Sequence, residues 1–167
     1  MGQDQTFKSK MAALAESNSA NREQILKVQE AHLQELKERV ETNKKKFVSM
    51  RSSEIVPLVR DLNEVFKKSE DVFQLFSEDQ ATALQDKIRT FCQVFYFRKG
   101  NKNFGFNSPS LLFECLPQSG IVKVSQHTEF GKAAPLKEIS IVKLDDFNKA
   151  AIEVLISSFV EKATLVG

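Results

Sequence analysis

Groups of basic and aromatic residues are interleaved between positions 87 and 106 of the sequence. The cations are Lys87, Arg89, Arg98, Lys99 and Lys102, and the rings are Phe95, Tyr96, Phe97, Phe104 and Phe106. Nucleic-acid surfaces use such mixtures, because cations bind phosphates and ring faces stack on unpaired bases. The pattern also fits a protein whose phenylalanines form the core while its cations decorate a solvated hairpin tip. The residues leave both interpretations open.

Residues with catalytic or metal-binding potential do not form a recognisable site in the sequence. Neither His32 nor His127 has a second histidine, cysteine or carboxylate at a metal-binding spacing. Asp145 and Asp146 fit the start of a helix, where carboxylates cap free backbone N–H groups. The stretch GNKNFG, residues 100–105, lacks the Lys-Ser/Thr ending of a phosphate-binding loop. We therefore expect a protein that is not an enzyme and uses no cofactor, metal ion or small-molecule substrate.

Composition says little about the partner. The 24 basic and 22 acidic residues of this 167-residue chain nearly cancel, so net charge neither requires nor excludes nucleic acid. Cys92 and Cys115 lie in apolar stretches, which is typical of reduced, buried thiols in a cytoplasmic protein. The apolar run from Val154 to Val160 is too short to span a bilayer. We expect a cytoplasmic protein that does not associate with membranes.

The first half of the chain predicts helices. Residues 3–56 contain no glycine or proline, and one apolar position recurs every seven residues, at Leu26, Leu33, Val40 and Phe47. Gln29 and Asn43 occupy the second position of the heptad, so this seam is too narrow to hold a lone helix. We expect the seam to mediate oligomerisation, as a homodimer, or to pack on the helix that follows.

Two further helices are predicted after a break or kink at Ser52, Ser53 and Pro57. Apolar residues at three-four spacing predict the second helix over 55–76. Ser77 and Gln80 form a capping-box pattern that predicts a third helix, continuing to Phe91.

The second half of the chain predicts a small sheet. Runs of β-branched and aromatic residues, separated by turn residues, predict strands over 92–97, 104–106 and 111–116 and from Ile121 and Ile139 onwards. Asp145 and Asp146 then predict the start of an apolar last helix. The fold class is α+β: a long N-terminal helical arm, a second amphipathic helix, a small antiparallel β-meander and a C-terminal covering helix. The predicted regions are a flexible tail (1–19), the helices (20–92) and the sheet with its last helix (93–167).

Part of the chain resembles the Gam family of phage host-nuclease inhibitors. The segment SEIVPLVRDL, residues 53–62, is similar to the helix–helix junction of that family. Weaker similarity extends over residues 72–80 and 87–90, and IVKLDDFNKAAI, residues 141–152, is similar to the family's late strand and helix start. The family has a helix between its middle strands, whereas residues 116–139 here predict two turns and a strand.

The resemblance implies a fold akin to the Ku core, acting as a dimer that encloses the end of duplex DNA and denies it to exonucleases. Lys87 and Arg89 would then contact phosphates from the sheet, and Arg98, Lys99 and Lys102 from a hairpin. Our first functional expectation is thus a non-enzymatic protein that binds duplex DNA or its ends and shields it from nucleases. The alternative is a coiled-coil, homo-oligomeric adaptor or scaffold whose arm and hairpin bind another protein.

Overall fold

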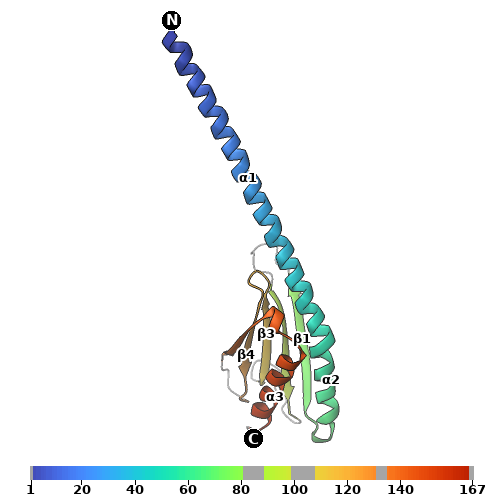
Figure 1. Cartoon of the computed structure of the whole chain (residues 1–167). Helices are drawn as coiled ribbons and strands as arrows, with labels where there is room; N and C mark the ends of the chain where they lie inside the picture. The colour runs from blue at the N-terminus through green and yellow to red at the C-terminus, as the bar shows by residue number, and fades with distance from the viewer. Residues whose placement is uncertain (1, 81–88, 99–107, 131–134, 166–167) are drawn as a thin grey trace. The chain divides into compact units, whose positions relative to one another are not determined.

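The computed structural model describes residues 2–80, 89–98, 108–130 and 135–165, without the side chains of residues 2–5, 79, 80 and 89. Contacts divide the chain into two units, residues 1–39 and 40–167, which we call the arm and the body. Figure 1 shows the elements in chain order, from blue to red.

The first helix, α1, runs from Gly2 to Met50. It therefore includes the segment predicted as a flexible tail. The absence of glycine and proline after Gly2, and the alanines between Met11 and Ala20, favour helix over the whole of this stretch. The predicted helical arm is confirmed.

The break predicted near Pro57 is a change of helix type. A π-helical segment, η1 (Arg51–Ile55), connects α1 to α2 (Val56–Val65), and Pro57 lies in the first turn of α2. A proline there disrupts little, because the first-turn N–H groups have no partner within their own helix.

The second helix is shorter than predicted. A 3-10 turn, η2 (Lys67–Ser69), follows α2, and Glu70 adopts a left-handed conformation with φ 59°. Strand β1 (Val72–Gln80) then begins. The predictions of helix over 66–76 and of a capping box at Ser77 and Gln80 were wrong, because the apolar residues here alternate between two faces: Phe73 is buried and Phe76 is exposed.

The sheet is an antiparallel meander in the order β1-β2-β3-β4-β5. The remaining strands are β2 (Arg89–Phe97), β3 (Ser110–Leu116), β4 (Ile121–His127) and β5 (Lys137–Lys143). Four of the predicted strands are confirmed, and β1 is the strand that the sequence prediction missed. The predicted strand at 104–106, and residues 81–88 of the predicted third helix, lie outside the described residues.

The last helix is present, but a different residue caps it. A 3-10 turn, η3 (Leu144–Asp146), precedes α3 (Lys149–Leu165). Asn148 Oδ1 accepts a hydrogen bond from the N–H of Ala151 at 3.0 Å. The cap is therefore Asn148 and not the predicted Asp145 and Asp146.

One hydrophobic core joins the helices to a single face of the sheet. The helices contribute Phe47, Ile55, Val59, Ile152, Ile156 and Phe159, and the strands contribute Phe73, Cys92, Val94, Tyr96, Leu111, Phe113, Cys115, Val122 and Val124. The expectation of an α+β fold with a covering helix is confirmed.

Candidate functional site

The predicted cation cluster does not gather at one place in the described residues. Arg89 and Arg98 lie at opposite ends of β2, and nine residues of extended strand span about 30 Å. Lys87, Lys99 and Lys102, with the side chain of Arg89, lie outside the described residues. An extended strand thus separates Arg89 from Arg98, the two members of the predicted cluster whose backbone the structure describes.

Arg98 is committed to contacts within the body. Its Nη2 donates a hydrogen bond to the carbonyl oxygen of Thr164 at 3.0 Å, and its Nε donates to the Tyr96 hydroxyl at 3.3 Å. The guanidinium carbon also lies 4.9 Å from the ring centre of Phe130. Burial raises the pKa of the Tyr96 hydroxyl, against the lowering effect of the Arg98 hydrogen bond. Arg98 thus connects the end of β2 to the last turn of α3, where a cation also suits the helix dipole.

The aromatic residues of β2 divide between the two faces of the sheet. Tyr96 is buried in the core, whereas Phe91, Phe95 and Phe97 occupy the alternate positions and are half-buried. The rings of Phe95 and Phe97 stack with their centres 6.1 Å apart. The ring centre of Phe76, on β1, also lies 6.1 Å from the ring centre of Phe91. The core therefore takes one set of rings, and the outer sheet face takes the other.

The predicted oligomerisation seam also divides in two. Leu26 and Leu33, on the arm, are exposed, whereas Val40 and Phe47, in the body, are buried. Phe47 is fully buried, and its ring stacks on Phe147 with centres 5.9 Å apart. Within the body this part of α1 therefore packs on its own chain.

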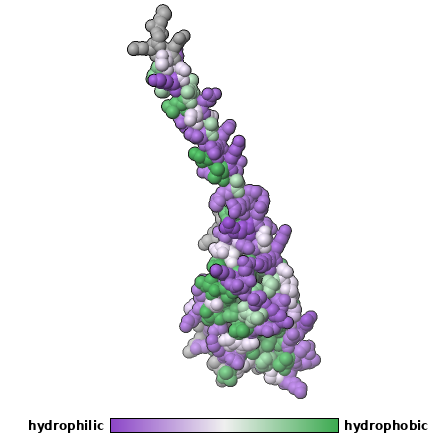
Figure 2. Space-filling view, in the orientation of Figure 1, coloured by the Kyte–Doolittle hydropathy of each residue, from purple (hydrophilic) through white to green (hydrophobic). Residues whose placement is uncertain are grey.

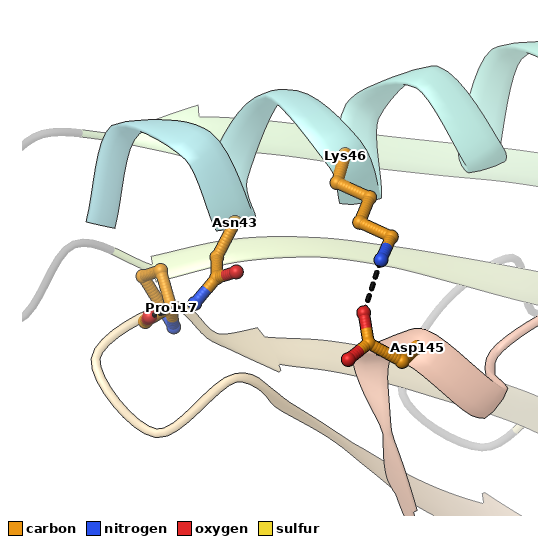
Figure 3. Close-up of polar contacts among 4 residues, drawn as sticks. All are labelled: Asn43, Lys46, Pro117 and Asp145. Atoms are coloured by element: carbon orange, nitrogen blue, oxygen red, sulfur yellow. Dashed lines mark hydrogen bonds and ion pairs between the residues drawn. The ribbon is translucent and has the colours of Figure 1, made fainter. Parts of the chain in front are cut away.

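Polar contacts fix the same stretch of α1 to the body (Figure 3). Asn43 Nδ2 donates a hydrogen bond to the carbonyl oxygen of Pro117 at 2.8 Å. Lys46 forms an ion pair with Asp145, whose pKa is lowered chiefly by the hydrogen bond from Lys46. The polar residue that interrupted the heptad thus has a structural partner in the β3–β4 turn.

The arm carries exposed apolar side chains, of which only Leu26 and Leu33 belong to the predicted oligomerisation seam. They are Phe7, Met11, Leu14, Ile25, Val28, Leu26 and Leu33, and Figure 2 shows hydrophobic side chains at several points along the arm. A shallow hollow on the helix surface is lined by Asn21, Gln24, Ile25, Val28 and Gln29. The three-four spacing from Phe7 was the available signal, but Asn18 and Asn21 interrupt it.

A second surface is a groove between α2 and α3 with a volume of about 350 Å³. Its apolar lining comes from Leu58, Leu62, Val65, Ile156 and Val160, and the carboxylates at the groove are Asp61, Glu153 and Glu161. The sequence placed these apolar residues in helices but gave no sign that two helices would leave a groove between them.

Both cysteines of the sequence lie in the interior of the body. Cys92 and Cys115 are buried as thiols, and burial raises the pKa of the Cys115 thiol to about 12. In the part of the chain that the structure describes, no group of His, Cys, Asp and Glu side chains could hold a metal ion. Nor is any helix in this part long and apolar enough to cross a membrane.

Comparisons with protein-family models, curated proteins and solved structures give no match to this chain.

Proposed function

We propose that the chain is a homo-oligomeric adaptor: the arm associates through its apolar side chains, and the body binds another protein. The exposed apolar residues of the arm carry this proposal. A helix that exposes a row of large apolar side chains gains free energy by burying them against a partner. The alternative expectation from the sequence is thus the one that the described surfaces support best.

The groove between α2 and α3 is the surface that we assign to the protein partner. Its lining is apolar and its charged residues are acidic, so the complementary partner is an amphipathic helix with basic residues beside its apolar face. Helices of this kind bind in apolar grooves through residues spaced three or four apart.

The arm is tested with the full-length chain and a variant carrying Leu14→Asp and Ile25→Asp. Sedimentation of the unmodified chain should give a mass above 18.9 kDa, and the variant should sediment as a monomer, because buried unpaired charges oppose association. Near-ultraviolet circular dichroism of the aromatic body serves as the folding control. A monomeric unmodified chain would refute association through the arm.

The groove is tested with a synthetic helical peptide of leucine and lysine as the probe. We expect fluorescence anisotropy to show binding to the unmodified chain and at least tenfold weaker binding to Glu153→Lys with Glu161→Lys. Glu41→Lys with Glu54→Lys is the matched control, because it makes the same charge change at carboxylates that do not line the groove. Equal weakening in both variants would leave only non-specific charge attraction and would reject the groove.

Duplex-DNA binding with protection from nucleases is the second candidate function. It is supported by Lys87, Lys99 and Lys102 in the sequence flanking β2, and by the rings of Phe91, Phe95 and Phe97 on the outer sheet face. Lysines bind phosphates, and rings can stack on the terminal base pair of a duplex end.

This second candidate predicts a salt-dependent affinity for linear duplex DNA. The substitutions Lys99→Ala and Lys102→Ala should reduce the slope of log affinity against log salt by about 2. Lys67→Ala with Lys68→Ala, on η2, is the control of equal charge. No binding, or equal effects of the two variants, would count against the lysines that flank β2, and equal affinity for a closed circle would count against end preference.

A further inference from the structure

One face of the arm carries a row of apolar residues with two asparagines at its centre and a histidine at one end. Starting at Phe7, alternating steps of four and three residues reach Met11, Leu14, Asn18, Asn21, Ile25, Val28 and His32. In an α-helix such positions lie above one another on one face. We call these eight residues the arm stripe. Leu26 lies about 100° around the helix from Ile25 and is outside the stripe.

The arm stripe has the same pattern when it is read in either direction. About a midpoint between Ser19 and Ala20, Asn18 mirrors Asn21, Leu14 mirrors Ile25, and Met11 mirrors Val28. At the outer ends Phe7 mirrors His32. In the inner pairs apolar residues therefore correspond to apolar residues and the two asparagines to each other, whereas the outer pair joins Phe7 to the polar His32.

We propose that two copies of the chain pair their arms in antiparallel orientation, with a two-fold axis between Ser19 and Ala20. A two-fold interface requires that when one residue contacts another, the second contacts the first in return. The mirror pattern meets this requirement along its whole length. This inference rests on the proposed function, since it names the partner of the arm.

The hollow on the arm fits this register. Its residues Asn21, Gln24, Ile25 and Val28 have the spacing of the four residues that form a hole for an incoming side chain in a coiled coil. In the antiparallel register the side chain opposite this hole is Leu14 of the second copy. Each Leu14 thus enters the hollow of the other arm.

The charges beside the stripe favour the antiparallel orientation over the parallel one. When the arms run in opposite directions, Lys8 and Lys10 of one copy flank the stripe opposite the uncharged Ala31 and Gln29 of the other. A parallel pair would instead place Lys8 and Lys10 beside the same lysines of the second copy, where like charges repel.

The asparagines at the centre define the register. Asn18 of each copy faces Asn21 of the other, so their amides can hydrogen-bond where an apolar partner would leave them unsatisfied. A polar residue inside a coiled-coil seam is a known means of fixing register at some cost in stability.

Disulfide cross-linking tests the orientation in the full-length chain. Met11→Cys and Val28→Cys are prepared as separate proteins, mixed and oxidised. We expect a cross-linked product of both variants in the mixture and none from Met11→Cys alone, because two copies of position 11 lie about 25 Å apart along the axis. The unmodified chain is the control for Cys92 and Cys115, which are buried. Efficient cross-linking of Met11→Cys with itself would overturn the antiparallel pairing, while an arm-mediated adaptor would survive.

A pair of neighbouring substitutions tests the arm stripe itself. Ile25 and Leu26 are each 57% exposed, so Ile25→Asp and Leu26→Asp make nearly the same chemical change at equally accessible positions. We expect Leu26→Asp to keep twice the 18.9 kDa mass of the chain and Ile25→Asp to reduce the mass to one chain. Dissociation by Leu26→Asp alone would overturn the stripe, and a monomeric unmodified chain would overturn both the stripe and the adaptor.

Discussion

Arg98 shows how a cation can look like a ligand-binding residue in sequence and be structural in the fold. Its guanidinium donates hydrogen bonds to the Tyr96 hydroxyl and to the Thr164 carbonyl oxygen. The same group also lies over the ring of Phe130. Thr164 is 66 residues away from Arg98 in the sequence, so no local sequence pattern could indicate their contact.

We predict that Arg98→Met destabilises the body while keeping the apolar stem of the side chain. Loss of hydrogen bonds from a charged donor should cost about 2 kcal/mol of unfolding free energy. Chemical denaturation followed by circular dichroism measures this difference. Arg60→Met, at an exposed position of α2, is the control and should change stability by less than about 0.5 kcal/mol. Equal effects at both positions would argue against the structural role of Arg98.

Cys115 allows a prediction about pH. Its folded-state pKa of about 12 exceeds the ordinary value of 9.0 because the thiol is buried. Above pH 9 the unfolded chain therefore ionises this thiol while the folded chain keeps it protonated, so its contribution to stability is lost as pH rises towards 12. Below pH 9 this contribution is fully present.

The same burial should make Cys115 slow to react. Only the thiolate is an effective nucleophile, so a thiol reagent at pH 8 should label the native chain far more slowly than the denatured chain. Mass spectrometry of labelled peptides separates Cys115 from Cys92. Rapid native labelling of Cys115 would show that the thiol reaches solvent.

At the scale of elements, Asn63 connects α2 to the edge strand β1. Its Nδ2 donates to the carbonyl oxygen of Phe73 at 2.9 Å, and its Oδ1 accepts from the N–H of Phe73 at 2.8 Å. The side-chain amide thus forms hydrogen bonds with both the N–H and the carbonyl oxygen of Phe73, as the backbone of a neighbouring strand would.

We predict that Asn63→Ala destabilises the body by about 1 to 3 kcal/mol, because it leaves both backbone groups of Phe73 without this partner. Asn63→Asp keeps the acceptor and loses the donor, so its stability should lie between those of the unmodified chain and Asn63→Ala. Thermal and chemical denaturation of the three proteins gives the order. A stability of Asn63→Asp at or below that of Asn63→Ala would contradict this account.

The strands and helices that the sequence predicted well are those with a single periodicity. Strands β3, β4 and β5 are short runs between turn residues, and α3 has a wide apolar stripe. Segment 72–80 was harder, because Val72, Phe73 and Phe76 fit a helix at three-four spacing as well as an alternating strand. Pairing with β2 places this segment in the sheet, and such long-range pairing is not encoded in a local pattern.

The candidate surfaces were less predictable than the fold. The heptad at Leu26, Leu33, Val40 and Phe47 correctly indicated a helix, but in the body Phe47 is buried in the core of its own chain and not at an oligomerisation surface. An exact repeat of seven drifts around an α-helix by about 20° per heptad. From Leu26 to Phe47 this drift amounts to about 60°, and the change from exposed to buried positions falls at Val40, where the body begins.

At the scale of the molecule, α1 belongs to both units, the arm and the body. Residues 40–50 contribute Val40 and Phe47 to the buried interior of the body, and Asn43 and Lys46 to its polar contacts. The arm, up to Arg39, has large apolar residues that are exposed. The stability of the body should therefore depend on where α1 is cut.

We predict that deleting residues 2–36 leaves the thermal midpoint of the body nearly unchanged, whereas deleting residues 2–50 lowers it severely. Loss of a buried phenylalanine such as Phe47 alone costs about 3 to 5 kcal/mol, which is a large share of the net stability of a domain. Near-ultraviolet circular dichroism and thermal denaturation of the two truncated proteins measure the contrast. Similar midpoints for both would mean that the last turns of α1 are dispensable to the body. The shorter deletion should also abolish self-association, because it removes the arm stripe while retaining every core residue of the body.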